Sequence, residues 1–312
     1  MFFAPIRHQI GGLLALALAW LAPEAFAAGT NYFQPVADTS LLEVAPSNNH
    51  GGFFGMNSGT TQNFKRTRAV FRFDLSSLPT NTVVQSAVVQ LAVTRQPDEP
   101  SPSITFGLHR MLRPWGEGDK NPSPTSPGSG SGLPASPGEA TWNFAFFPTN
   151  AWSTPGGASG IDFSATESSF TQVYGVDESP YRFENSPEMI ADAAAWIVEP
   201  QNNFGWLLLC NEEHLNFTAR RWGTREDANN PPILELEFLV PPVLQIVKPN
   251  PAQTELHFPA WAEHHYEVRY RDSLTTGTWL TLTNLSAAPT NYAAIIVDSA
   301  SVTQRFYRVS AY

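Results

Sequence analysis

The sequence is poor in cysteine and in basic residues. Its one cysteine, Cys210, cannot form an internal disulfide, so side-chain packing has to stabilise the fold. Cys210 also follows the apolar run GWLLL, which favours a buried and unreactive thiol over a nucleophile. Only 18 lysines and arginines stand against 28 aspartates and glutamates, a formal net charge of −10. This balance excludes the broad basic surface that nucleic acids and anionic membranes require.

Long hydrophobic runs are missing after the N-terminal segment, and that segment has the parts of a signal peptide. Within residues 1–27, Arg7 supplies a positive start, Gly11–Ala22 is apolar, and Ala25–Ala27 is an A-x-A cleavage signal. No later run reaches the roughly 18 apolar residues of a transmembrane helix. We therefore expect an exported protein, secreted, extracellular or at the cell surface, with no transmembrane segment after signal cleavage.

Specific catalytic motifs are absent as well. The sequence contains no G-x-S-x-G, no P-loop and no H-E-x-x-H. We therefore predict a protein that is not an enzyme and needs no cofactor. One hypothesis for a bound cation is structural calcium held by Asp38, Asn48 and Asn49, although the D-x-[DN]-x-[DN]-G loop is missing.

What the sequence does contain is a series of short strands. In RAVFRFDL, the side chains of Phe71, Phe73 and Leu75 fall on one face, and SAVVQLAVT, TFGLHRML and ILELEF repeat this period of two. Gly205–Cys210 is expected to be a strand buried on both faces. These strands predict an all-β fold, in which residues 28–240 form a jelly-roll β-sandwich.

One segment, SPEMIADAAAWIVEP, predicts a short helix. Ser186 is the expected N-cap, Pro187 is the first helical residue, and Pro200 ends the helix. Helical spacing separates a face toward the sandwich from a face toward solvent: we expect Ile190, Ala194 and Ile197 to be buried, and Asp192 and Glu199 to be exposed.

Two changes of composition indicate a loop and a domain boundary. Residues 118–139 are mostly Gly, Ser and Pro, which predicts a flexible surface loop. Pro241-Pro242 interrupts the strand pattern, which then restarts with six strand-like runs. Residues 243–312 are therefore predicted to form a second, smaller sandwich of immunoglobulin or fibronectin type, with Trp261 and Trp279 in its core.

Basic side chains gather in two places, KRTR and RRWGTRED. Arginine outnumbers lysine 15 to 3, and planar guanidinium groups suit the bidentate binding of carboxylates. Aromatic rings beside them would add stacking against an acidic sugar. The predicted ligand face consists of Lys65, Arg66, Arg68, Arg220, Arg221 and Trp222.

The alternative use of these arginines is structural pairing. Alternation along a strand puts Arg220 and Arg221 on opposite faces, so only one of them can reach a ligand. The other would need a partner in the core. Arg225 is predicted to form a structural ion pair with Glu226 or Asp74.

Seven blocks in a fixed order resemble the DNRLRE-type domain, also described as the family-96 carbohydrate-binding module. The resemblance covers about Asn31 to Val240 and rests on DTSLLEVAPSNNHGG, KRTRAVFRFDLSSLPTNTVVQSAVVQLAV, LHRMLRPWGEG, ATWNF, MIADAAAWIVEPQNNFGWLLL, RRWGTRED and PPILELEF. It implies a jelly-roll domain that is not catalytic and that binds polysaccharides such as alginate. The C-terminal runs YEVRYRDSLTTGTW and RFYRVSAY are similar to fibronectin-type repeats of exported bacterial proteins.

We therefore expect an exported carbohydrate-binding protein whose ligand is a polysaccharide, and the arginines favour an acidic one. Two other classes remain open. The chain could be a structural or adhesive surface protein without a sugar site. It could also be a polysaccharide lyase or glycoside hydrolase, for which His109 or Tyr174 would have to converge with the arginines in one cleft.

Overall fold

The computed structural model describes residues 29–98, 103–125, 129–241, 243–250, 253–299, 302 and 304–311. The signal peptide predicted at residues 1–27 lies outside these residues. The described chain is mostly β, with antiparallel sheets and one short α-helix, so the predicted all-β sandwich class is confirmed. None of its helices is long and apolar enough to cross a membrane.

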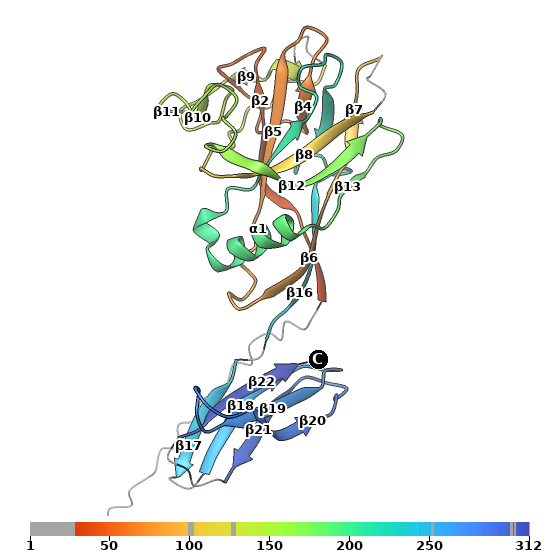
Figure 1. Cartoon of the computed structure of the whole chain (residues 1–312). Helices are drawn as coiled ribbons and strands as arrows, with labels where there is room; N and C mark the ends of the chain where they lie inside the picture. The colour runs from red at the N-terminus through yellow and green to blue at the C-terminus, as the bar shows by residue number, and fades with distance from the viewer. Residues whose placement is uncertain are drawn as a thin grey trace, which may run out of the picture.

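Two sheets form the larger body of the molecule (Figure 1). The smaller sheet has the order β1 (Gly29–Phe33), β16 (Ile233–Leu239), β6 (Val83–Leu91) and β13 (Tyr181–Phe183). The larger sheet has the order β12 (Phe163–Val173), β8 (Ile104–Met111), β14 (Trp206–Cys210), β5 (Arg66–Phe73), β4 (Gly55–Thr60), β15 (Arg220–Gly223) and β7 (Val93–Arg95). A further strand, β2 (Pro35–Leu42), pairs with β5.

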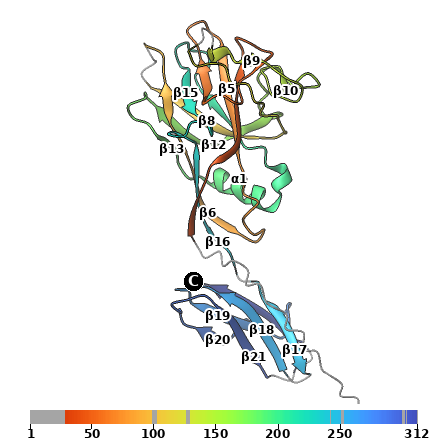
Figure 2. The same cartoon turned by 180° about the vertical axis from the view of Figure 1, so that it is seen from behind.

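Short elements cover the larger sheet outside these strands. Two small ribbons pair β3 (Asn48–Asn49) with β9 (Leu133–Pro134), and β10 (Phe144–Phe146) with β11 (Asn150–Ala151). A 3-10 turn, η1 (Ser129–Ser131), precedes β9. Figure 2 shows β9 and β10 from behind, beside the upper end of β5.

The central strands of the larger sheet, β5 and β14, are buried on both faces. Toward the smaller sheet, the larger sheet contributes Phe71, Trp206 and Trp222, all with 0% exposure. On its other face, Val70 and Leu207 pack with Trp142 in a second hydrophobic cluster under the segment between β8 and β12. The strand predicted at Gly205–Cys210 is β14, and its near-continuous apolar sequence reflects this double burial.

The predicted helix exists as α1 (Pro187–Val198), followed by the 3-10 turn η2 (Pro200–Asn202). Ser186 is its N-cap, and the Ser186 hydroxyl accepts a hydrogen bond from the Met189 amide. The helix packs against β6 and β12. Its buried face is rotated from the predicted one, since Ile197 is buried but Ile190 and Ala194 are only partly buried.

Asp192, predicted to be exposed, is 6% exposed and forms the centre of a polar cluster. Its Oδ2 accepts hydrogen bonds from the Ser168 hydroxyl at 2.6 Å and the Trp206 indole at 2.9 Å, and Arg110 lies 3.5 Å away. Burial raises the pKa of Asp192, and these donors lower it. The prediction was wrong because polarity alone does not reveal partners on other strands.

The predicted flexible loop, residues 118–139, is irregular but anchored at both ends. Asn48 donates a hydrogen bond to the Ser131 carbonyl at 2.9 Å, and the Lys120 ammonium lies 3.0 Å from Glu139. Glu139 is only 7% exposed. Its described parts, residues 118–125 and 129–139, therefore pack against the sandwich, and the flexibility of the loop stays a prediction.

The strands after residue 244 form two three-stranded sheets of their own, seen as the blue body in Figure 1. One has the order β17 (Gln245–Asn250), β18 (Gln253–Ala260) and β21 (Tyr292–Asp298), and the other has the order β20 (Leu280–Leu285), β19 (Tyr266–Arg271) and β22 (Phe306–Ala311). Trp261 is buried between them with 4% exposure. Trp279, predicted to be in the core, is instead half-buried and contacts arginines on the outer surface.

We expect Ile197→Ala to lower the free energy of unfolding by about 2 to 5 kcal/mol, because Ile197 is 1% exposed and truncation leaves a cavity. The adjacent Val198 is 56% exposed, so Val198→Ala should change stability by about 0.5 kcal/mol or less. Urea denaturation of both variants would measure the difference. Equal losses would contradict the assigned helix face.

Candidate functional site

Strand β15 divides the side chains of its RRW sequence between the two faces of the sheet. Arg220 and Trp222 are 1% and 0% exposed, whereas Arg221 points to the opposite side and is half-buried. Trp222 packs against Phe106, with ring centroids 5.2 Å apart. The prediction that Trp222 belongs to a ligand face is therefore wrong, because its ring fills the core.

Arg220 also turns inward, and it organises the backbone around it. Its Nη1 donates hydrogen bonds to the carbonyls of Phe217, Thr218 and Ala219 at 3.3, 3.1 and 3.2 Å. Its Nη2 donates to the carbonyl of Tyr174 at 3.1 Å. Arg220 thus fixes the loop that enters β15 to the end of β12, and its predicted role as a ligand contact is replaced by a structural one.

The KRTR cluster is mostly engaged inside the protein. Arg68 is 8% exposed, and its guanidinium forms hydrogen bonds of 2.9 and 2.7 Å to both carboxylate oxygens of Glu213. Arg66 is paired with Glu43 at 3.2 Å and lies over the ring of Trp142. Only Lys65 is exposed. The predicted ligand role of Arg68 is therefore also wrong.

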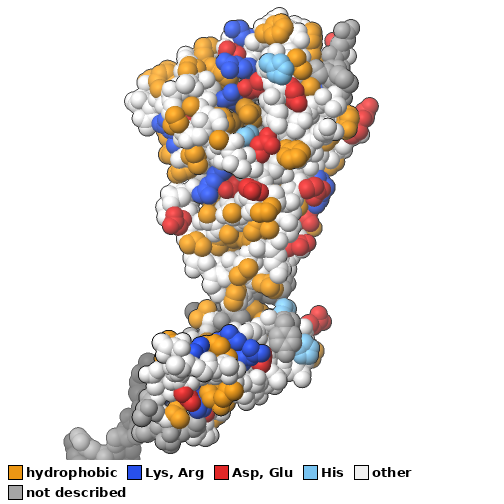
Figure 3. All heavy atoms as spheres, viewed as in Figure 1, with side chains coloured by type: hydrophobic (Ala, Val, Ile, Leu, Met, Phe, Trp, Pro, Cys, Tyr) orange, Lys and Arg blue, Asp and Glu red, His pale blue; other side chains and the backbone are white. Residues whose placement is uncertain are grey.

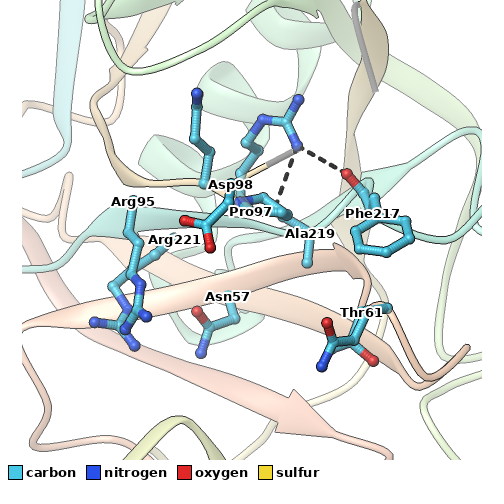
Figure 4. Close-up of a pocket in the computed structure, with 11 residues that line it drawn as sticks. Asn57, Thr61, Arg95, Pro97, Asp98, Phe217, Ala219 and Arg221 are labelled. Carbon is cyan, nitrogen blue, oxygen red and sulfur yellow. Dashed lines mark hydrogen bonds between the residues drawn. The ribbon is translucent and has the colours of Figure 1, made fainter. Parts of the chain in front are cut away.

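A cavity of about 560 Å³ opens over β4, β15 and β7. Polar side chains dominate its lining, with one aromatic wall and one carboxylate: Asn57, Thr61, Gln62, Arg95, Gln96, Pro97, Asp98, Phe217, Ala219, Arg220 and Arg221. Figure 4 shows Arg95 and Arg221 at one side of the cavity and Phe217 at the other. Of the predicted ligand residues, the cavity brings together Arg220 and Arg221 and leaves out the KRTR cluster.

Two arginines face each other across this cavity floor. Arg221 of β15 is the register partner of Asn57 on β4 and of Arg95 on β7, so the three side chains form a row across three strands. Like charges directly opposite in a sheet are destabilising. Burial and the charge of Arg95 both lower the pKa of Arg221. No carboxylate of the described residues forms an ion pair with either of these two arginines.

The stem of Arg221 is held in place by its surroundings. Its guanidinium lies over the ring of Phe53, with Cζ 5.0 Å from the ring centroid, and over Phe54 at 5.8 Å. Gly55 makes room for it, since a Cβ atom at that position would lie 2.6 Å from Arg221 Cδ. Its Nε is buried and has no hydrogen-bond partner within the described chain. The side chain is therefore preorganised toward the cavity.

Two phenylalanines in adjacent loops adopt left-handed backbone conformations, and one of them, Phe217, lines the cavity. Phe64 has φ 56° and Phe217 has φ 60°, a region that is uncommon for bulky residues. Their loops are adjacent, because Asn216 Nδ2 donates to the Gln62 carbonyl at 3.5 Å. Phe64 is 63% exposed, and Phe217 lines the cavity. Such backbone strain is concentrated at binding sites.

Arg225 is held by carboxylates on one side of the sandwich. Its guanidinium lies 2.8 Å from Glu117 and 3.1 Å from Glu226, the latter being a partner expected from the sequence. Asp74, the other expected partner, instead accepts a hydrogen bond from the Ser76 amide at 2.9 Å. The main partner, Glu117, comes from the loop after β8, which sequence proximity could not reveal.

Asp38, a candidate calcium ligand, lies buried beside this cluster. Its Oδ2 accepts a hydrogen bond from the Arg225 amide at 2.9 Å, and its Oδ1 has no partner within the described residues. Burial raises the pKa of Asp38 well above its usual value, and the charges of Glu226 and Glu117 add to this rise.

The two asparagines proposed with Asp38 are engaged elsewhere. Asn49 Oδ1 accepts from the Gly51 and Lys120 amides at 2.9 and 3.4 Å, and Asn48 contacts the loop carbonyl of Ser131. The described residues contain no group of three or more His, Cys, Asp or Glu side chains that could hold a metal ion. Calcium therefore stays a prediction that no ligand cluster supports.

The candidate catalytic groups lie apart. His109 and Tyr174 occupy opposite ends of the β8–β12 pair, where His109 faces Glu167 and Tyr174 follows the register pair Val173 and Ile104. His109 is 6% exposed and its Nδ1 lies 2.9 Å from the Ser164 carbonyl. Burial lowers the pKa of His109 and raises that of the Cys210 thiol to about 12. Cys210 is thus a poor nucleophile.

We expect Asp38→Asn to stabilise the protein at neutral pH and to lose this advantage in acid. A carboxyl group whose pKa is raised by folding binds more protons in the folded state, so its contribution to stability falls as pH rises through that window. The slope reaches at most about 1.4 kcal/mol per pH unit. Thermal unfolding between pH 4 and pH 8 would measure it.

Asp74→Asn is the matched control, because hydrogen bonds from Ser76 lower the pKa of Asp74. Its contribution is present at neutral pH and disappears as pH falls, so the variant should be less stable than wild type at pH 7 and equal in acid. A pH-independent effect of Asp38→Asn would indicate an ionised, partnered carboxylate. Destabilisation of the wild type by EDTA would then support calcium.

Comparisons with known proteins add little to this geometry. No family model matches the chain, and no curated protein matches it. One solved structure, the glycoside hydrolase domain of Spr0440, Endo-D, from Streptococcus pneumoniae R6, is 9% identical with a TM-score of 0.12. The alignment covers 91% of this chain and 36% of that chain, so this chain spans about a third of its length. A similarity this low carries no argument about fold or function.

Proposed function

We propose that the protein is a non-catalytic binder of an anionic polysaccharide, and that the sugar chain occupies the cavity over β4, β15 and β7. The observation that carries this proposal is the opposition of Arg95 and Arg221. A carboxylate placed between two guanidinium groups relieves their repulsion and gains charge-assisted hydrogen bonds. The repulsion in the free protein thereby becomes part of the binding energy.

The remainder of the lining suits a sugar. Asn57, Gln62 and Gln96 supply amide donors and acceptors for hydroxyl groups, and Thr61 adds a hydroxyl. Phe217 provides an apolar wall against which the C–H face of a sugar ring can pack. Polar side chains with one aromatic wall are typical of a site that binds a hydrated sugar ring, and the two arginines would bind the carboxylate that this ring carries.

A purely structural or adhesive role would leave two features of the cavity without a reason. Most arginines of the larger body form ion pairs with carboxylates. Arg68 pairs with Glu213, for example, and Arg225 pairs with Glu117. Arg95 and Arg221 are placed against each other instead. The left-handed backbone of Phe217 in the cavity lining adds strain that a structural surface does not need.

An enzymatic role has less support than binding. Glycoside hydrolysis generally uses two carboxyl groups across the cleft, and the described lining includes one, Asp98. A lyase would need a base beside the arginines, but the described lining includes neither a histidine nor a tyrosine. Binding without catalysis is therefore the function that we propose.

We expect Arg221→Gln and Arg95→Gln each to weaken the binding of an anionic polysaccharide about 10-fold to 100-fold. This range corresponds to the loss of a charged hydrogen bond, about 1.5 to 3 kcal/mol. Affinity electrophoresis or calorimetry with alginate and polygalacturonate, and with neutral amylose for comparison, would measure it. Binding should also weaken as salt is raised from low to physiological concentration.

The matched control is Arg182→Gln, because Arg182 is an exposed arginine paired with Glu184 and Glu235 on the other sheet. This variant should bind as the wild type does. Two results would contradict the proposal: wild-type protein that binds no anionic glycan at low ionic strength, or equal loss of affinity in all three variants.

A further inference from the structure

The outer face of the sheet β20–β19–β22 carries a second group of arginines. The smaller body is formed by the two sheets after residue 244. The side chains of Tyr266 and Val268 on β19 point into its core and are 0% exposed. Alternation therefore places Glu267, Arg269 and Arg271 on the outer face. Figure 3 shows a cluster of basic side chains on this smaller body, next to hydrophobic ones.

Two of these arginines again stand opposite each other. Arg269 on β19 is the direct register partner of Arg308 on β22. Glu267 is paired with Arg269 at 2.5 Å, and Arg308 is exposed. The local net charge is +2, because this face carries three arginines, Arg269, Arg271 and Arg308, and one glutamate, Glu267. Like charges in register weaken a sheet unless an anion lies over them.

Trp279 lies at the centre of this arginine cluster. The Cζ atoms of Arg308 and Arg271 are 4.6 and 5.4 Å from its ring centroid. Arg271 is fixed by hydrogen bonds to the carbonyls of Ser273 and Thr276. The tryptophan therefore holds the cations in place by cation–π contacts on a half-exposed surface, rather than filling the core.

Arg305, in the same smaller body, has a structural role because it pairs with carboxylates. Its guanidinium lies 2.8 Å from Asp272 and 2.9 Å from Asp298, and its Cζ is 4.0 Å from the ring centroid of Tyr270. Arg308 forms no ion pair within the described chain. Arg308, unlike Arg305, is therefore not needed to neutralise a buried carboxylate.

We propose that this face, made by Arg269, Arg271, Arg308 and Trp279, is a second binding surface for the anionic polysaccharide. The inference rests on the proposed function for the class of ligand. Residues 243–312 contain 5 basic and 5 acidic residues and are therefore neutral overall. The other residues include 13 basic and 23 acidic ones, so the net charge of −10 lies entirely outside residues 243–312. A polyanion is repelled by most of the molecule and is attracted at the two arginine clusters.

Two contacts on one polymer chain give more affinity than either alone. Once the arginines of the cavity have bound a long polysaccharide chain, the outer face of β20–β19–β22 encounters the same chain at a high effective concentration. If the geometry allows both contacts, the overall affinity rises by a factor of about 10² to 10⁴. A short oligosaccharide cannot bridge two clusters on separate sheets. Chain length is therefore the variable that separates the two surfaces.

The test uses the mature full-length protein with long-chain alginate and polygalacturonate, and with tetrasaccharides of each. Arg308→Gln should weaken the binding of the long chains at least 10-fold and leave the binding of the tetrasaccharides unchanged. Arg221→Gln should weaken both. Arg308→Lys, which keeps the charge but loses the planar contact with Trp279, should recover part of the loss. Lys248→Gln is the matched control, because Lys248 is an exposed cation on the other sheet of the same module.

The outcomes separate the two proposals. If Arg221→Gln weakens binding and Arg308→Gln does not affect the long chains, the second surface is wrong and the proposed function stands. If only Arg308→Gln weakens binding, the cavity is wrong and the outer face is the polysaccharide site. Binding to vesicles that contain phosphatidylserine, with no binding to either glycan, would overturn both and assign the face to an anionic lipid surface.

Discussion

The arrangement of the larger body depends on which face of the sheet each side chain of Arg220, Arg221 and Trp222 on β15 occupies. Trp222 packs in the core and Arg220 accompanies it, because residues two apart in a strand share a face. A guanidinium that is 1% exposed is tolerated only where its donors are satisfied. The Nη1 and Nη2 donors of Arg220 meet this requirement with the carbonyls of residues 217–219 and of Tyr174. The loop before β15 is thereby fixed, and Arg221 is left on the outer side, facing Arg95.

The same physical rule explains the use of arginine throughout an acidic protein. Several buried or partly exposed arginines link segments that are far apart in the sequence: Arg68 meets Glu213, Arg113 meets Asp162, and Arg225 meets Glu117. In a protein with a single cysteine, these links connect loops to strands as disulfides do elsewhere. The two places where arginines oppose each other instead are the exceptions, and these exceptions carry the functional proposals.

Sequence periodicity predicted the strands and the helix well because these depend on local alternation and capping. The strand containing Phe71 and Phe73 and the helix that begins after Ser186 were both found in this way. The site was only partly predictable. Alternation required Arg220 and Arg221 to face opposite sides, but it could not decide which side was the core. Trp222 was assigned to the ligand for that reason.

The decisive neighbours were also out of reach of local patterns. Arg95 and Arg221 are 126 residues apart in the sequence, and only the pairing of β7 with β15 brings them together. Glu117, which immediately precedes the loop predicted at residues 118–139, reaches Arg225 from a distant part of the sequence. A basic residue in an edge strand resembles ordinary solubilising charge in the sequence. Its role becomes visible only with the register of its partner.

The lining of the cavity bears on the proposal that its ligand is a polymer and not a small compact molecule. The cavity lies over the face of β4, β15 and β7, with Phe217 at one side (Figure 4). Small-molecule sites bury most of the ligand in an apolar enclosure. Here most of the lining residues have polar side chains, and Asn57, Arg221 and Arg95 form a row across three neighbouring strands. A row of this kind matches a chain that runs across the strands and presents its carboxylates in succession. Ligand residues outside the cavity can then extend along the surface, where each added contact is weak and the chain as a whole is held.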